Sequence, residues 1–265
     1  MDLSESGGFL SNSLPSPSPS NASVSSISSN LPQPRTKPLR AGSAKEQAAR
    51  RYVENKLLHI SRRYTKKFAD AAEGNTVTGY VSMKEVAKDI SEIIDVLWLS
   101  GTPNLQIPYL FNIALTMSTY PTKFPPAPVT TFAVLRKLDH AFASLLRGED
   151  SVTGEVLPGF QSCRRAGMSQ TDMVRCRSIV EDTRVMIVDV MSREVESETE
   201  TENEGDGDDE TSNGADGMDL DGEDDSDYDN DELAMDIARV YGATIMELGE
   251  RLESGPNIGI GHNVS

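Results

Sequence analysis

The sequence predicts an all-α protein: a single bundle of five or six helices with a disordered N-terminal tail and a disordered acidic loop. Apolar residues recur at spacings of three and four in successive segments, which is typical of amphipathic helices. Capping residues and glycines mark where these segments begin and end. The sequence contains no series of alternating apolar and polar residues that would indicate a sheet, and no internal repeat.

Composition divides the chain into five regions. Residues 1–42 are rich in Ser and Pro and predict a solvated tail. Residues 43–193 predict the helical bundle, and residues 194–231 predict a disordered acidic insertion. Residues 232–254 predict a C-terminal helix that packs on the bundle, because lengthening the intervening loop costs only about 0.6 kcal/mol per doubling. Residues 255–265 predict a flexible tail.

The first helix is predicted to begin after Ser43, because Ser43 and Glu46 have the spacing of a capping box. It is predicted to run to about Ala72, with Gly74 as the stop signal. Its core-facing residues follow helical spacing: Val53, Leu57, Ile60, Tyr64 and Phe68.

The second and third helices are separated by a short turn. Ser82 and Glu85 form a second candidate capping box, and Gly101 ends the helix that follows. Thr102 and Pro103 suit the N-cap and first position of a third helix, which is apolar around most of its circumference and is predicted to be buried.

Trp98 stands at the end of an apolar stripe and is predicted to be buried between the second and third helices. The prolines from Pro121 to Pro128 prevent the third helix from continuing, and a fourth helix is predicted from about Thr130 to Leu146, with Gly148 as its stop signal.

The fifth predicted helix begins after Ser169, with Asp172 at the acidic capping position. β-branched residues within 185–188 leave a strand as an alternative for that short stretch. Beyond the acidic run, apolar residues recur at helical spacing from Leu233 to Leu252 and predict the last helix.

The acidity of the chain is concentrated in one block. Between Glu194 and Glu232 there are twenty carboxylates and no Lys or Arg. The net charge of the whole chain is −17, whereas the chain without this block carries 25 basic residues against 22 acidic ones. A block of like charge with few large apolar residues cannot offset the entropy of ordering, so it is predicted to stay available to a basic partner.

The acidic run contains one aromatic residue in its densest part, an arrangement that suits binding to a Lys/Arg-rich protein surface. The alternative is a spacer that only increases solubility. The predicted binding residues are Asp224, Asp225, Asp227, Tyr228 and Asp229.

The exposed face of the first helix is predicted to be basic. Arg62, Arg63, Lys66 and Lys67 are the candidate binding residues, and they suit an acidic protein surface or weak contact with DNA phosphates. The alternatives are a solvated outer face, or a face masked by the acidic run of the same chain.

Four serines are candidate phosphorylation sites. Ser16 and Ser18 precede prolines, and Ser197 and Ser226 have acidic residues three positions later. Phosphorylation at the last two would add further negative charge to the acidic run.

No catalytic or cofactor site is predicted. The histidines and the two cysteines lack metal-ligand spacing, and two cysteines without an apolar leader indicate a reducing compartment. Asp139 and His140 are adjacent on a helix and point about 100° apart, which disfavours a catalytic pair. The Gly-rich stretch 255–261 follows a helix, whereas a phosphate loop follows a strand. No apolar run is long enough to span a membrane.

Three stretches carry a resemblance to a known family: residues 51–58 (RYVENKLL) continuing to 68, residues 99–110 (LSGTPNLQIPYL) and residues 135–142 (LRKLDHAF). They resemble the fungal sixth-numbered accessory subunit of the general transcription and repair factor TFIIH. The resemblance is clearest over residues 44–146 and weaker over 169–193 and 232–253.

The resemblance implies a nuclear, non-enzymatic subunit that binds the XPB-type helicase of TFIIH and promotes its dissociation from the complex. It assigns no catalytic residue and no cofactor. The alternative function is an acidic chaperone that binds histones or other basic nuclear proteins through the acidic run, with the bundle only presenting it.

Overall fold

The computed structural model describes residues 31–69, 77–161, 167–201 and 230–253. The predicted all-α fold is confirmed: within these ranges the only β pairing is an isolated bridge between Glu149 and Val156. The elements are α1 (Ala44–Lys67), α2 (Met83–Ser100), α3 (Pro103–Met117), the short 3₁₀ helix η1 (Pro121–Lys123), α4 (Pro128–Arg147), α5 (Gln170–Thr201), α6 (Asn230–Arg239) and α7 (Gly242–Glu253).

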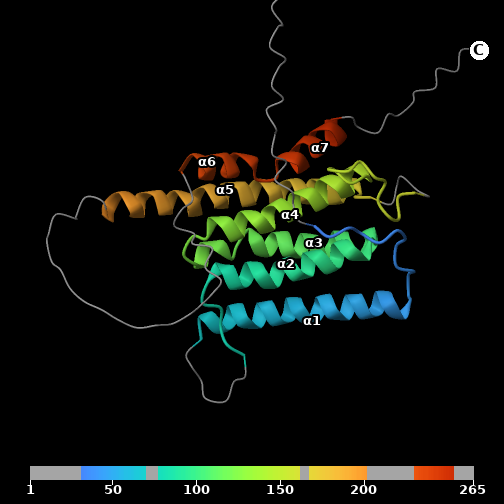
Figure 1. The fold of residues 1–265 in the computed structure, drawn as a ribbon, viewed down its shortest axis with the longest axis horizontal. Coiled ribbons are helices and arrows are strands. Elements are labelled where there is room, and N and C mark those ends of the chain that lie inside the picture. Colours follow the sequence, from blue (N-terminus) through green and yellow to red (C-terminus); the bar gives the residue numbers. More distant parts are fainter. Residues whose placement is uncertain (1–30, 70–76, 162–166, 202–229, 254–265) are drawn as a thin grey trace, which may run out of the picture.

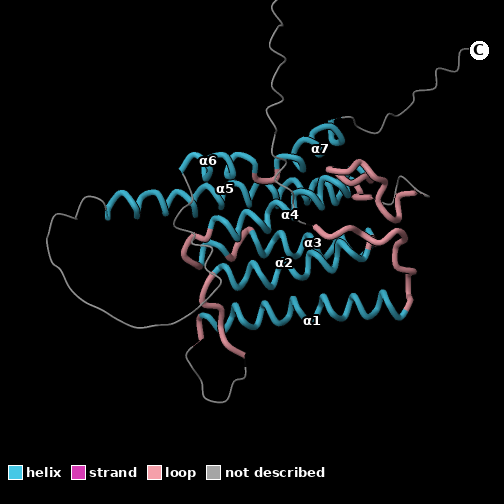
Figure 2. Tube along the Cα trace, viewed as in Figure 1, coloured by secondary structure: helices cyan, strands magenta, loops and turns pink. Residues whose placement is uncertain are grey.

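The helices are stacked across the bundle, with α1 along one edge, α6 and α7 along the opposite edge, and α2 to α5 between them (Figure 1). α1 packs on α2, and α2 packs on α3 and α4. α5 packs on α3, α6 and α7. Most of the described loops gather at the two ends of the bundle (Figure 2). The end that holds the C-terminus of α1 also holds η1 and the C-terminus of α5.

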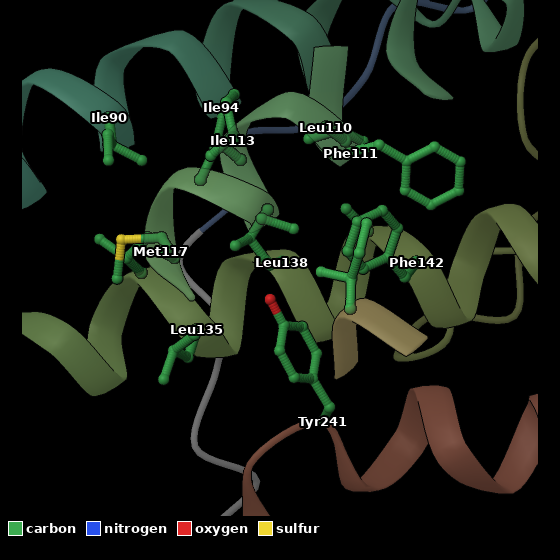
Figure 3. Close-up of a cluster of buried hydrophobic side chains, with 14 of the residues drawn as sticks. Ile90, Ile94, Leu110, Phe111, Ile113, Met117, Leu135, Leu138, Phe142 and Tyr241 are labelled. Carbon is green, nitrogen blue, oxygen red and sulfur yellow. The ribbon is translucent and has the colours of Figure 1, made fainter. Parts of the chain in front are cut away.

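The core forms where α2, α3 and α4 meet. Ile94 of α2, Ile113 of α3 and Leu138 of α4 are fully buried at this junction, and Tyr241 enters it from the segment between α6 and α7 (Figure 3). Burying side chains of this size contributes about 1.5–3 kcal/mol each. Trp98 is only 1% exposed, so its predicted burial is confirmed. Its indole packs edge-on against the ring of His140 in α4.

The predicted helix starts depend on local hydrogen bonds. Ser43 Oγ accepts from the backbone N–H of Glu46 at 3.2 Å, and Ser169 and Asp172 form a reciprocal capping box. Ser82 is an N-cap without a side-chain hydrogen bond, contrary to prediction. The carboxylate of Glu85, the other half of the predicted capping box, forms an ion pair with Arg63 of α1.

Glycines end α2 and α4 as predicted. Gly101 and Gly148 both adopt left-handed backbone conformations, with φ of 54° and 79°. At Gly148 a Cβ atom would lie 2.7 Å from the ring of Phe160, so the close approach of the following loop also requires glycine.

Several boundaries differ from prediction. α1 ends at Lys67, and Ala72 lies outside the described residues. α5 continues to Thr201, inside the region predicted as a disordered insertion. The single C-terminal helix predicted over 232–254 is two helices, because Tyr241 adopts a φ of 55° between α6 and α7.

Part of the predicted N-terminal tail packs on the bundle. Leu39 is buried, and its backbone N–H donates to Oγ1 of Thr102 at 2.8 Å. Thr102, the N-cap of α3, therefore holds this segment instead of capping its own helix. Residues 1–30 of the predicted N-terminal tail and the predicted C-terminal tail, residues 255–265, lie outside the described residues.

Candidate functional site

The four cations predicted on α1 do not share one environment. Arg62 is exposed, Lys66 and Lys67 are half-buried, and Arg63 faces α2 with its side chain 18% exposed. Because α1 lies at one edge of the bundle and packs mainly against α2, its opposite face remains on the surface.

Arg63 belongs to a polar network that joins α1 to α2. Its guanidinium forms ion pairs with Glu85 and, at 3.2 Å, with Asp89, and it donates to the carbonyl of Thr78 at 3.3 Å. It also stacks 4.0 Å from the centre of the Tyr80 ring. The Tyr80 hydroxyl donates to Asp89 at 2.6 Å, and burial together with this bond raises the pKa of Tyr80.

This network corrects the prediction for Arg63. The residue stabilises the interface between two helices and is not part of the exposed basic face. Helical periodicity places Arg63 beside the apolar stripe of α1, but it does not show which acidic residues of another helix lie opposite.

Lys67 lies among aromatic rings at the end of α1. Its Nζ is 4.5 Å from the centre of the Phe124 ring and 6.0 Å from that of Phe68. Tyr64 stacks on Tyr120 with ring centres 3.6 Å apart, and Phe68 meets Tyr64 edge-on at 5.3 Å. We call these four residues, Tyr64, Phe68, Tyr120 and Phe124, the aromatic cluster.

Sequence reasoning placed Tyr64 and Phe68 on the core-facing stripe of α1, which is wrong for Phe68 because it is 60% exposed, and it did not predict that Tyr120 and Phe124 would meet them. Two aromatics four residues apart on α1, and two more flanking η1 at the same spacing, were a usable signal. Their meeting in space depends on α3, which returns the chain to the end of the bundle where α1 stops.

Arg62 and Lys66 line a shallow hollow of about 350 Å³ on the outer side of α1. Neither residue forms a salt bridge with a carboxylate in the part of the chain that the structure describes. By contrast, Arg50 pairs with Glu46 and Lys56 pairs with Glu92, each at 2.8 Å. The C-terminal half of α1 therefore carries two cations, Arg62 and Lys66, without a described carboxylate partner.

The acidic candidates Asp224, Asp225, Asp227, Tyr228 and Asp229 lie outside the described residues, as do Ser16, Ser18 and Ser226. Ser197 lies in the last turns of α5, in the helical backbone. The structure brings none of these residues to the basic face within the described ranges, and their roles stay predictions.

Asp139 and His140 have separate structural roles. Asp139 accepts hydrogen bonds from the start of α7, and His140 lies 3.1 Å from the carboxylate of Asp150. Asp150 also accepts backbone N–H bonds from Val152 and Thr153, which hold the loop after α4.

The remaining ionisable candidates add no reactive site. Cys176 is buried, and burial raises the pKa of its thiol to about 12, so it is protonated at neutral pH. No group of His, Cys, Asp and Glu in the described ranges could hold a metal ion. None of the helices described here is both long and apolar enough to cross a bilayer.

The fold is thus an α-helical bundle with a charged, aromatic-lined end, and its sequence identifies the family. Residues 79–249 match the family TFB6, described as subunit 11 of the general transcription factor TFIIH. Because the match covers more than half of the chain, the chain belongs to this family. No curated protein and no solved structure shows significant similarity to it.

Family membership makes the chain a TFIIH-associated subunit of the transcription and DNA-repair machinery. The match begins at Gly79, just before α2, and ends within α7. It includes two of the stretches that carry the sequence resemblance, 99–110 and 135–142. The stretch from 51 to 68 lies outside it.

Proposed function

We propose that the chain is a non-enzymatic, nuclear subunit that binds the XPB-type helicase of TFIIH and promotes its dissociation from the complex. The observation that carries the proposal is the family match over residues 79–249. A subunit with this role needs a rigid surface for the helicase and a means of weakening the contacts that hold the helicase in the complex.

The surface for the helicase is the outer face of α5. Val174, Val185 and Val188 lie at helical spacing within the matched region and are 57%, 72% and 50% exposed. The valines lie at the two ends of one helix face, and the exposed ion pair between Arg177 and Glu181, at 2.8 Å, lies between them, so a partner would meet both apolar and charged groups there. The face from Val174 to Val188 covers 14 helical steps, or roughly 21 Å at the 1.5 Å rise of an α-helix.

The acidic run would compete with the rest of TFIIH for contacts on the helicase. It joins α5 to α6, so a helicase bound along α5 would lie next to a dense negative charge. Acidic residues around Tyr228 would compete for basic helicase surfaces that otherwise contact the rest of TFIIH. Release would then combine one apolar contact with one electrostatic contact.

A release assay tests the proposal. TFIIH is immobilised through a core subunit, the purified full-length chain is added, and the helicase in the supernatant is measured against the other subunits. The wild-type chain should release helicase selectively, whereas Val185→Glu with Val188→Glu should reduce release at least tenfold. Val81→Glu with Val152→Glu is the matched control, because these valines are 77% and 63% exposed, lie off α5 and add the same charge.

Two outcomes would contradict the proposal. If the wild-type chain leaves the helicase bound, the dissociation role is wrong. If affinity purification recovers histones instead of TFIIH subunits, and only when residues 202–229 are present, the acidic chaperone is the better description.

A further inference from the structure

α1 and α3 border a groove, because both helices pack on α2. Its floor is apolar and includes Ile90 of α2, with Ile60 and Ile113 beside it, and all three side chains are buried. The groove has a volume of about 390 Å³, which admits one large side chain of a partner. The remaining lining residues stand on its two walls: Leu57, Leu58 and Ser61 on α1, and Asn112, Thr116 and Tyr120 on or just after α3.

Two contacts hold α1 at a fixed distance from α3 and the turn that follows it. At one end of the groove, the Tyr109 hydroxyl donates to Glu54 at 2.6 Å. At the other end, the rings of Tyr64 and Tyr120 stack with their centres 3.6 Å apart. The groove is therefore formed before a partner binds, and a preformed site loses less entropy on binding.

Leu58 is the exposed apolar residue of this groove. Its side chain is 48% exposed, whereas the adjacent Leu57 is partly buried against the core. A single exposed leucine is ordinary on a protein surface, but Leu58 stands beside a groove with an apolar floor. A side chain that enters the groove would therefore remove apolar surface from water on both partners.

The groove is continuous with the hollow lined by Arg62 and Lys66. Ser61 lines both depressions, and Arg62 lies one helical turn after Leu58. Arg62 and Lys66 form no salt bridge with a carboxylate in the described ranges, so their charge is available to a ligand. One surface thus combines an apolar groove with two adjacent cations.

The two parts of this surface favour an acidic peptide over a nucleic acid. Both ligands would bring negative charge to Arg62 and Lys66. A peptide also brings an aliphatic or aromatic side chain that can enter a groove walled by Leu58. A nucleic-acid base would need an open ring on which to stack, and Tyr120, the ring in the groove lining, is already stacked on Tyr64.

We propose that the groove between α1 and α3 binds a short acidic segment of a partner protein that carries one large apolar side chain. The apolar side chain enters the groove and covers Leu58, and the acidic residues lie against Arg62 and Lys66. Glu54 lies at the opposite end of the groove and would repel them there, which fixes the orientation of the segment. The site uses α1 and α3, so it does not depend on helicase binding along α5.

Fluorescence anisotropy with the full-length chain tests the proposal. The probe is a short fluorescein-labelled peptide of Asp and Glu with one central Phe, and the matched peptide has Ala in place of Phe. At about 0.15 M salt the screening length is about 8 Å, so charges elsewhere on the chain act weakly at the site. The Phe peptide should bind about tenfold more tightly than the Ala peptide, because the two have the same charge and only Phe fills the groove.

The groove is tested by removing its exposed apolar wall. Leu58→Ala should weaken binding of the Phe peptide about fivefold and change binding of the Ala peptide by less than about twofold. Leu115→Ala is the matched control, because Leu115 is 49% exposed on α3 and does not line the groove. This control should bind both peptides within about twofold of wild type.

The cations are tested by charge reversal. Arg62→Glu with Lys66→Glu should weaken binding of both peptides at least tenfold, because it replaces attraction with repulsion. Lys37→Glu with Arg40→Glu is the matched control and changes the net charge equally. Both of its residues are exposed and lie in the segment before α1, so it should bind within about twofold of wild type.

Four results would overturn the proposal. The first is the absence of binding of the Phe peptide. The second is equal affinity for the two peptides, or an equal effect of the two charge reversals, which indicates unspecific attraction. The third is oligo-dT of the same charge that binds more tightly than the Phe peptide, which assigns the surface to a nucleic acid. The fourth is a tenfold gain in peptide affinity on Tyr228→Ala, which shows that the acidic run of the chain itself occupies the groove.

Discussion

Asp139, in the middle of α4, caps the start of α7 through Thr244, which lies 105 residues later in the chain. Oδ1 of Asp139 accepts from the backbone N–H of Thr244 at 2.7 Å and from its hydroxyl at 2.6 Å. Oδ2 accepts from the N–H of Ala243 at 3.3 Å. A carboxylate from one helix thereby supplies the N-terminal cap that α7 lacks in its own sequence.

We expect Asp139→Ala to lower the free energy of unfolding by about 1–3 kcal/mol, because it leaves amide groups at the start of α7 without an acceptor. The loss should be local, so hydrogen exchange should accelerate in α7 more than in α2. Asp139→Asn keeps one acceptor oxygen and should cost less. Equal exchange rates for α7 in the wild type and Asp139→Ala would show that packing alone holds the helix.

The same residue predicts a pH dependence. Burial raises the pKa of Asp139, and the hydrogen bonds from Thr244 and Ala243 lower it in part. The folded state therefore holds the proton more tightly than the unfolded state. Relative to Asp139→Asn, the wild type should lose stability as pH rises from the ordinary value of 3.8 through the raised folded-state pKa. Urea unfolding of both proteins across this range measures the difference, and a wild type that gains stability instead would refute the predicted sign.

Tyr241 offers a substitution that should stabilise the fold. Its side chain is 1% exposed, and its hydroxyl points into the apolar core near Leu138 without a hydrogen-bond partner among the described residues (Figure 3). An unsatisfied buried polar group costs about 1–3 kcal/mol, so Tyr241→Phe should raise the free energy of unfolding by about 1 kcal/mol. Tyr241→Ala is the contrasting variant and should lower it by about 3–5 kcal/mol. Destabilisation by Tyr241→Phe, measured by urea unfolding, would mean that the hydroxyl has a partner.

Arg62 and Arg63 are adjacent but should respond differently to substitution. Arg63→Ala removes the ion pairs to Glu85 and Asp89 and should cost about 2 kcal/mol, because hydrogen bonds to charged groups contribute about 1.5–3 kcal/mol. Arg62→Ala removes an exposed side chain and should change stability by no more than about 0.5 kcal/mol. Thermal unfolding of the two variants compares these roles directly. An equal loss of stability in both would contradict the conclusion that Arg63 stabilises the helix interface while Arg62 is exposed.

Local sequence signals predicted the features that depend on neighbours in the chain. The capping box at Ser169 and the side-chain cap at Ser43 form because the partners lie three residues apart on one helix, although the carboxylate of Glu46 accepts from Gly42 rather than from Ser43. The helix ends at Gly101 and Gly148 were also predictable locally, because glycine readily adopts the left-handed backbone conformation found there. The predicted stripe on α2 also placed Trp98 correctly in the core.

Features that depend on two distant segments were not predictable in this way. Glu85 has the spacing of a capping residue, but Arg63 on α1 outcompetes the local bond. The break at Tyr241 interrupts an apolar pattern that continues at helical spacing on both sides. The aromatic cluster forms only because α3 and η1 return Tyr120 to Tyr64. Each of these needs a spatial neighbour that periodicity does not specify.

Replacement of residues 202–229 by a short Gly/Ser linker tests whether the bundle folds independently of the acidic run. α5 and α6 pack on each other, although the end of α5 extends beyond the start of α6 (Figure 1), so the linker has to be long enough to return along α5. A shorter connection costs less entropy to close, and removing fourteen carboxylates reduces like-charge repulsion. The variant should therefore keep its helical circular dichroism and a single cooperative melting transition, with a midpoint equal to or slightly above that of the wild type. Any gain should shrink as salt is added, because screening weakens the repulsion that the wild type carries. A broad, non-cooperative transition would show instead that the acidic run is part of the folded structure.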